Sequence, residues 1–205
     1  MNKKKGLFIS FEGPEASGKS SQILLLQKYL TKKNISFITT REPGGTKLAE
    51  SLRTLILKIK SDINIEEEIL MLMAARSHHI NNIIKPALDK GSLVISDRFA
   101  DSTFVYQGYV NNFGIQKAKS LHKNILNNFL PHKTFLFNLS TSKIIARLKN
   151  RKSKNKYDKL ERNFHDQVNR GYELISKNKR FIKIDASKSI SSINKKIINT
   201  INLLI

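Results

Sequence analysis

The chain has 205 residues, 40% of them hydrophobic, which suits a single α/β domain with a sizeable core. It contains no cysteine and no run close to 18 apolar residues, so the sequence excludes a disulfide scaffold, a thiolate metal site and a membrane span. Lys and Arg number 37 against 16 Asp and Glu, which gives a formal net charge of +21.

The basic excess has two interpretations. It is typical of proteins that bind nucleic acid or membranes, but it also suits a polyanionic substrate in a chain rich in Lys, Asn and Ile. The lysines are scattered along the chain rather than gathered in one block, which favours the second interpretation. We therefore expect no specific nucleic-acid partner and no membrane partner. The apolar run behind the basic N-terminus is too short for a signal peptide, so a cytoplasmic location is expected.

The first predicted element is a buried strand over Leu7–Phe11, followed after Glu12 by the residues GPEASGKS. These match the phosphate-loop pattern G-x-x-x-x-G-K followed by Ser or Thr at every fixed position. Glycines let successive N–H groups turn toward one anion, and the helix that follows adds its positive N-terminus. Lys19 is expected on the β- and γ-phosphates of ATP and Ser20 on Mg²⁺. The predicted ATP-binding residues of the loop are Gly13, Pro14, Glu15, Ala16, Ser17, Gly18, Lys19, Ser20 and Ser21.

Four more apolar runs of strand length follow, separated by segments of helical length. They are Ser36–Thr39, Leu93–Ser96, Thr134–Leu139 and Phe181–Asp185. Their near-continuous apolar character is typical of strands covered on both faces. The alternation predicts a three-layer α/β/α fold with a five-stranded parallel sheet, formed by residues 1–205 as one domain. A segment at about 149–160, dense in Lys, Arg and Asn, is expected to form a mobile surface loop inserted within this domain, and it is called the lid segment below.

Polar residues follow the second and third predicted strands, where ligands collect in open α/β sheets. Arg41 and Glu42 begin a turn with Pro-Gly-Gly, which suits either a second substrate site or a solvated turn. Asp97 and Arg98 end the third strand. The acid can order the water shell of Mg²⁺ and the arginine can bind a phosphate, although a surface ion pair would have the same sequence.

A long helical segment is predicted over Glu66–Leu88. The adjacent His78 and His79 do not form a metal site, because neighbouring residues do not face each other on a helix. Arg76 lies among apolar residues of this helix, and a cation in such surroundings needs an acceptor.

Six blocks of the chain resemble the thymidylate kinase family, which phosphorylates thymidine 5′-monophosphate (dTMP) with ATP. In order they read FEGPEASGKSSQ, TREPGGTKLAESLR, EILMLMAARSHH, SDRFADSTFVYQG, YDKLERNFHDQVNRGY and IDASKSI. They cover nearly the full length. The resemblance implies a P-loop NTPase-type fold, ATP and Mg²⁺ as co-substrate and metal, and a homodimer.

The resemblance also implies roles for individual residues. Glu15 approaches the sugar hydroxyl and a metal-bound water, Tyr106 crowds the sugar against ribose, and Arg98 with Arg53 clamps the monophosphate. The implied catalytic residues are Lys19, Glu15, Asp97, Arg98, Lys154 and Arg151. The implied dTMP-binding residues are Glu15, Glu42, Pro43, Arg53, Leu72, Arg76, Arg98, Thr103, Tyr106 and Gln107, of which Arg76, Thr103 and Gln107 read thymine. Asp185, Ala186 and Ser187 lie under the adenine, and Ser20 and Asp97 hold the metal.

The chain departs from the family pattern at several places, one of which is the lid, where Lys154 stands in place of the expected Arg. Leu72 stands where the family has a Phe that stacks on thymine, so a kinase of another nucleoside monophosphate is an alternative. Phe99 replaces the usual Tyr. Ala16 replaces the phosphate-loop Arg of eukaryotic members, so the lid is expected to supply that cation. A nucleic-acid-binding P-loop ATPase is a further alternative, motivated by the net charge.

Two lid residues are candidates for the missing cation. Lys154 is favoured by its position in the family block, and Arg151 by its planar fork of donors. Arg147 is disfavoured because it falls in an apolar-periodic helix, Ile144–Leu148, and is expected to stay outside the part that closes.

Overall fold

The structure is a computed structural model that describes residues 6–57, 62–149 and 161–205. Five parallel strands form one sheet in the order β2-β3-β1-β4-β5. Their bounds are β1 Leu7–Glu12, β2 Phe37–Arg41, β3 Leu93–Asp97, β4 Lys133–Asn138 and β5 Phe181–Asp185. All five predicted strands are confirmed, with ends that differ by at most two residues. The expected five-stranded parallel sheet is therefore correct.

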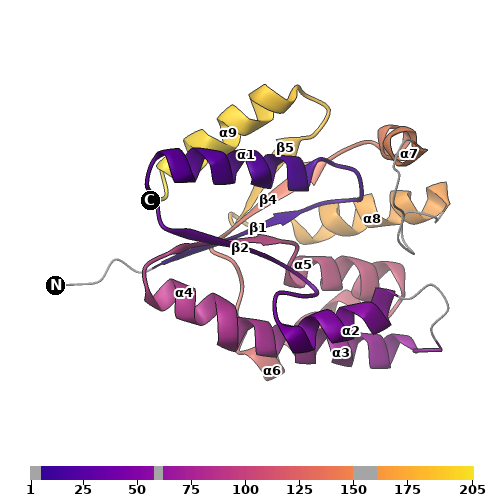
Figure 1. The fold of residues 1–205 in the computed structure, drawn as a ribbon. Helices are drawn as coiled ribbons and strands as arrows, with labels where there is room; N and C mark the ends of the chain where they lie inside the picture. The colour runs from indigo at the N-terminus through magenta and orange to yellow at the C-terminus, as the bar shows by residue number, and fades with distance from the viewer. Residues whose placement is uncertain (1–5, 58–61, 150–160) are drawn as a thin grey trace.

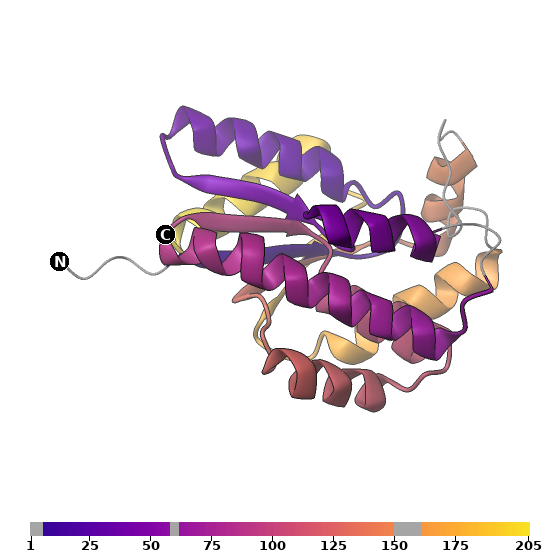
Figure 2. The same ribbon diagram turned by 60° about the horizontal axis from the view of Figure 1, so that its bottom comes forward.

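Helices cover both faces of the sheet and make three layers (Figure 1). On one face lie α1 Lys19–Lys32 and α9 Ile190–Asn202, and Figure 2 shows the helices of the opposite face brought forward. The remaining α-helices of the described residues are α2 Lys47–Leu57, α3 Ile65–His79, α4 Lys85–Asp89, α5 Ala100–Thr103, α6 Ile115–Leu126, α7 Thr141–Lys149 and α8 Arg162–Ile175, and π-helical segments cover Ile80–Ile84 and Phe104–Val110. None of the helices among the described residues has the length and apolar character needed to cross a membrane.

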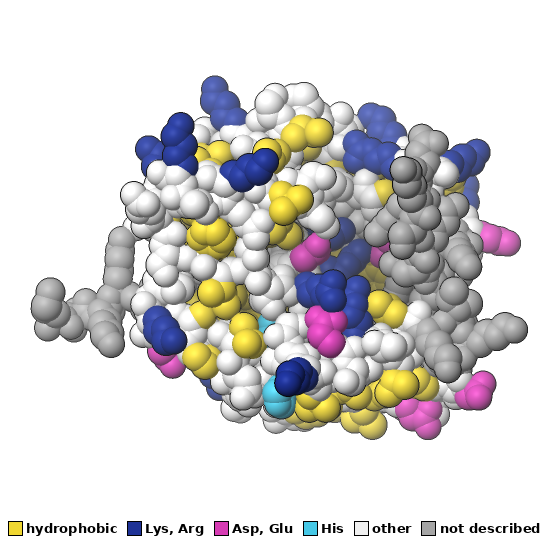
Figure 3. Space-filling view, in the orientation of Figure 1, with side chains coloured by type: hydrophobic (Ala, Val, Ile, Leu, Met, Phe, Trp, Pro, Cys, Tyr) yellow, Lys and Arg dark blue, Asp and Glu magenta, His cyan; other side chains and the backbone are white. Residues whose placement is uncertain are grey.

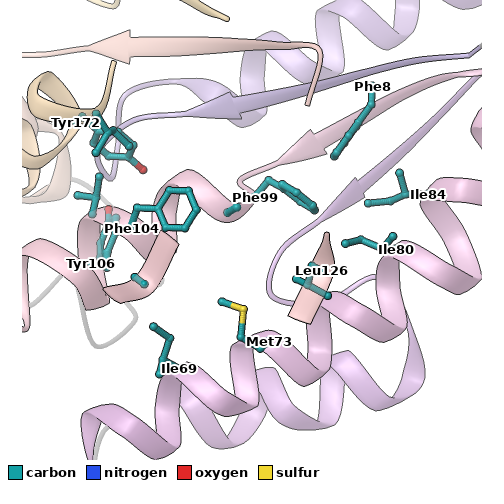
Figure 4. Packing of buried hydrophobic residues seen from close by; sticks show 14 of the residues in the cluster. Phe8, Ile69, Met73, Ile80, Ile84, Phe99, Phe104, Tyr106, Leu126 and Tyr172 are labelled. Carbon is teal, nitrogen blue, oxygen red and sulfur yellow. The ribbon is translucent and has the colours of Figure 1, made fainter. Parts of the chain in front are cut away.

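The two helical layers exist because both faces of the strands are apolar. Successive residues of a strand point to opposite faces, and in β1 Phe8 packs in one core and Ile9 in the other. The larger core lies under α3, α5 and α6, and its buried cluster includes Phe99 and Phe104 together with Met73 and Leu126 (Figure 4). Both cores lie against the sheet, so the strand ends that carry polar residues are held rigidly.

The predicted helix over Glu66–Leu88 is divided in the structure. α3 ends at His79, a wide π-helical turn covers Ile80–Ile84, and α4 begins at Lys85. Pro86 explains the change, because it has no N–H to donate to the carbonyl one α-turn before it. The segment stays helical, as predicted, but it is not one regular α-helix.

His122 of α6 is fully buried, and its Nε2 contacts the carbonyl of Phe129 at 2.9 Å. Burial lowers the pKa of His122 from 6.5 to about 4. As the pH falls, His122 is therefore protonated in the unfolded chain before it is protonated in the folded protein. The free energy of unfolding should fall as the pH drops from about 6.5 toward 4. A His122→Gln variant should lose less stability over this range in urea titrations. An identical pH dependence in the two proteins would contradict the assignment.

Candidate active site

The phosphate loop connects the end of β1 to the start of α1. Gly13 has φ 131°, and a Cβ atom there would lie 2.5 Å from the carbonyl oxygen of Phe137, so only glycine fits. The Nζ of Lys19 donates to the carbonyls of Gly13 at 2.9 Å and Pro14 at 2.8 Å. Burial, with the nearby charge of Arg98, lowers the pKa of Lys19 to about 8. A buried ammonium group thus lies inside a loop whose shape suits a phosphate chain.

Ser20 and Asp97 lie together beside this loop. The Ser20 hydroxyl donates to Oδ2 of Asp97 at 3.0 Å. Parallel pairing places Asp97 opposite both Phe11 and Arg41, at the shared carboxyl edge of the sheet. Among the described residues no cluster of three or more His, Cys, Asp or Glu side chains could hold a metal. Two oxygen donors beside a phosphate site do fit Mg²⁺, which keeps several waters and uses few protein ligands.

Arg98 and Glu15 form an ion pair at the centre of the cleft. Nη2 of Arg98 donates to Oε1 of Glu15 at 2.9 Å, and the hydroxyl of Tyr106 donates to both Glu15 oxygens at 2.8 Å. Burial alone would raise the pKa of Glu15, but Arg98 and Lys19 outweigh it and the pKa is lowered. The guanidinium of Arg98 also lies 5.2 Å from the centre of the Tyr106 ring. This geometry holds the tyrosine ring in one place.

Glu12 anchors Arg98 from below, a role that the sequence did not indicate. Its carboxylate accepts from the backbone N–H of Phe99 at 2.7 Å, from Ser102 at 2.7 Å and from the hydroxyl of Tyr172 at 2.9 Å. Ser102 and Tyr172 in turn accept from Nη1 of Arg98. Burial, and then repulsion from Asp101, raises the pKa of Glu12 to about 7. The only sequence signal was an acid at the end of an apolar strand.

The other end of the cleft is organised around Arg76. Its Nε donates to Glu42 at 2.6 Å and its Nη2 to Thr103 at 2.8 Å. Glu42 also contacts Nδ1 of His79 at 3.0 Å. The acceptor that Arg76 was expected to need is therefore Glu42.

His79 is completely buried, and its Nε2 contacts the hydroxyl of Thr40 at 2.6 Å. A Cβ atom at Gly45, whose φ is 85°, would lie 2.6 Å from Nε2 of His79. The Pro-Gly-Gly turn thus packs directly on this histidine, and the Glu42–Pro43 peptide bond within it is cis. His79 supports Glu42, a role that the sequence did not indicate.

Most of the predicted site residues line one cleft of about 550 Å³. Figure 3 shows basic and acidic side chains gathered in a hollow on this face. The lining contains Glu15, Ala16, Ser17, Gly18, Lys19, Ser20, Ser21, Glu42, Pro43, Arg53, Leu72, Arg76, Asp97, Arg98, Thr103, Tyr106 and Gln107. Gly13 and Pro14 support the loop from beneath through their carbonyls. The two lid candidates, Arg151 and Lys154, lie outside the described residues.

Arg147 links the phosphate loop to the predicted adenine loop. It lies in α7, as expected, but its Nη1 donates to the carbonyl of Ala16 at 3.1 Å and its Nη2 to that of Ala186 at 3.0 Å. Asp185 and Ser187 flank Ala186 and are joined by a 2.7 Å hydrogen bond. The sequence disfavoured Arg147 as the missing cation, whereas the structure places its guanidinium between two predicted ATP-binding segments.

A phosphate loop, an adjoining pair of oxygens that suit a metal ion, and arginines that line the same cleft together define a P-loop phosphotransferase whose acceptor is itself an anion. The family model described as "Thymidylate kinase" matches residues 11–197. A thymidylate kinase of Mycoplasma capricolum is 41% identical over 200 residues, which are 95% of this chain and 94% of that protein. One of Halothermothrix orenii is 38% identical over 196 residues, 94% of this chain and 95% of that protein. The chain belongs to the thymidylate kinase family.

The fold comparison agrees with the sequence comparison. The crystal structure of a thymidylate kinase from Ehrlichia chaffeensis matches with a TM-score of 0.76 and 30% sequence identity. The match covers 96% of this chain and 99% of that chain. The predicted P-loop NTPase-type fold is therefore confirmed.

Proposed function

We propose that the residues of this cleft carry out the reaction of the family, in which the γ-phosphoryl group of ATP passes to the 5′-phosphate of dTMP. Family membership makes the chain a dTMP kinase that uses ATP as co-substrate with Mg²⁺. The comparisons favour neither alternative, a kinase of another nucleotide or a nucleic-acid-binding ATPase. The observation that carries the assignment of residues is that one cleft holds both the phosphate loop and the arginines Arg53, Arg76 and Arg98.

Phosphoryl transfer of this kind asks little covalent chemistry of the protein. It requires two anions to be held in line and the charge between them to be neutralised. Lys19 neutralises the β- and γ-phosphates, and Arg98 with Arg53 holds the acceptor phosphate. Arg53 is supported by its own bond from Nη1 to the carbonyl of Pro43 at 2.7 Å.

Ser20 and Asp97 would hold Mg²⁺, which supplies charge neutralisation to the phosphate oxygens when bound. Glu42, fixed by Arg76 and His79, lies beside the acceptor end of the cleft. Asp185, Ala186 and Ser187 would lie under the adenine, and Arg147 supports this arrangement from the phosphate-loop side. Whether Lys154 or Arg151 supplies the lid cation stays a prediction.

The proposed activity is tested by coupled ADP release with the common nucleoside monophosphates offered in turn. dTMP should give the highest kcat/KM, and its ribose counterpart should fall at least about tenfold below it. The buried ring of Tyr106, held by Glu15, should crowd a 2′-hydroxyl. Choice of base should be less strict than choice of sugar, because Leu72 cannot stack as an aromatic ring does. Equal kcat/KM for the ribose and deoxyribose forms would refute this role of Tyr106.

We also propose a homodimer. Leu48 and Leu55 of α2 and Leu70 of α3 are between 47% and 55% exposed, although they are large apolar side chains. Figure 3 shows hydrophobic side chains along the lower edge, where Figure 1 places α2 and α3. A second copy of the chain could cover them. The cytoplasmic location and the absence of a specific nucleic-acid partner stay predictions.

A further inference from the structure

Gln107, one of the residues lining the cleft, has a buried acidic partner. Its Nε2 donates to Oε1 of Glu68 at 2.6 Å, and the two residues are only 4% and 7% exposed. Glu68, Leu72 and Arg76 follow one another at intervals of four residues on α3, so they share the face that is turned toward the cleft. Leu72 and Arg76 line the cleft and Glu68 does not. Glu68 therefore acts on Gln107 from behind.

The carboxylate determines which way the Gln107 amide lies. A carboxylate only accepts hydrogen bonds, so the amide must turn its NH₂ group to Glu68 and its Oε1 away from it. The reverse orientation would set two acceptors against each other at hydrogen-bonding distance. The backbone of Gln107 is also fixed, since its carbonyl accepts from the N–H of Phe113 at 3.1 Å.

The fixed amide lies in a cleft that also contains Arg76, whose guanidinium only donates. Within the described part of the chain, the hydrogen bond of the Arg76 Nη1 group is a long one, to Sδ of Met73 at 4.0 Å. The cleft thus offers an acceptor from Gln107 and a donor from Arg76. Thymine and uracil present an N3–H donor beside a carbonyl acceptor, whereas cytosine presents an acceptor at N3 and an amino donor at C4.

We propose that Glu68 is a positioning residue that sets base specificity: by orienting the Gln107 amide, it makes the cleft accept an imide base, thymine or uracil, and reject cytosine. This inference rests on the proposed function, because it takes the cleft of Arg76 and Gln107 as the site of the nucleobase. Glu68 contributes to specificity through Gln107 and need not touch the substrate.

The test compares dTMP, dUMP and dCMP as substrates of the wild type and of Glu68→Gln. The new amide can donate or accept, so Gln107 can turn in either direction. The ratio of kcat/KM for dTMP over dCMP should fall about tenfold or more. The ratio for dTMP over dUMP should stay unchanged, because these two bases share the imide edge. Glu66→Gln, an exposed acid on the same turn of α3, is the matched control and should alter neither ratio.

A double-mutant cycle shows whether Glu68 acts through Gln107. Gln107→Ala should lower the ratio of dTMP over dCMP, and adding Glu68→Gln should lower it no further. If the Glu68→Gln variant does not fold, the same ratios are measured with Glu68→Asp, whose shorter side chain moves the carboxylate away from Gln107. Two outcomes in a folded variant would overturn the inference. In one, the ratios of dTMP over dCMP and of dTMP over dUMP fall together, and in the other neither ratio changes. A wild type that does not phosphorylate dTMP would instead refute the proposed function itself.

Discussion

Replacing Lys19 with alanine is expected to lower kcat by at least about 10³-fold while the fold persists. The Nζ of Lys19 is enclosed by the carbonyls of Gly13 and Pro14 and lies 3.3 Å from the hydroxyl of Ser17. An exposed lysine such as Lys28 cannot take its place, because the position inside the loop is what directs the charge to the β- and γ-phosphates. Burial lowers the pKa of Lys19, which means that the buried charge disfavours the folded state. Removing this charge should therefore not unfold the protein.

The measurement is coupled ADP release at saturating ATP and dTMP, with circular dichroism to confirm folding. Lys28→Ala is the matched control, since Lys28 is an exposed lysine of the same helix. It should keep the wild-type kcat. A Lys19→Ala enzyme that retained more than about a tenth of the wild-type turnover would show that the loop does not act as assigned.

Replacing Arg98 with alanine is expected to lower kcat/KM for dTMP by about 10³-fold. Its backbone adopts φ 69°, a left-handed conformation stabilised where the N–H of the next residue donates to Glu12. Its guanidinium is then held between Ser102, Tyr172 and Glu15. The side chain is preorganised for an anion in the cleft, so its loss removes both a charge and a fixed direction.

The expected loss should be specific to the acceptor. KM for ATP should change much less than kcat/KM for dTMP, because Lys19 and the loop backbone still hold the ATP phosphates. Arg98→Lys should recover part of the loss, since it restores the charge without the planar fork. Arg170→Ala, which removes an exposed arginine of α8, is the control. An Arg98→Ala enzyme with a normal kcat/KM for dTMP would remove Arg98 from the clamp.

Much of the fold could be predicted because its signals are local. Runs such as Leu93–Ser96 and Phe181–Asp185 are apolar on both faces, and only a sheet covered by two helical layers buries both. The phosphate loop could also be predicted from the sequence, since its glycines and Lys19 must stand at fixed spacings around one anion. Asp97 and Arg98 could be placed at the ligand edge because parallel strands end together there.

The less regular parts of the chain were predicted less well for physical reasons that are also local. The helix after Asn64 begins with a capping box, in which Asn64 and Glu67 bind each other's backbone N–H groups. Its continuation to Leu88 was expected from apolar periodicity, but Pro86 widens the turn before α4. Periodicity does not distinguish an α-helical turn from a wider one, so the π-helical segment could not be foreseen.

The sequence by itself determined the strand–helix alternation, the phosphate loop and the family. Only the tertiary structure decided which buried groups support the reacting ones: Glu12 beneath Arg98, His79 behind Glu42, Glu68 behind Gln107, and Arg147 between two loops. The hydrogen bonds that make these arrangements join residues that lie between 37 and 131 positions apart in the sequence. A buried polar side chain needs a partner, but no local pattern names a partner so far away. The packing of helices on the sheet brings these groups within hydrogen-bonding distance.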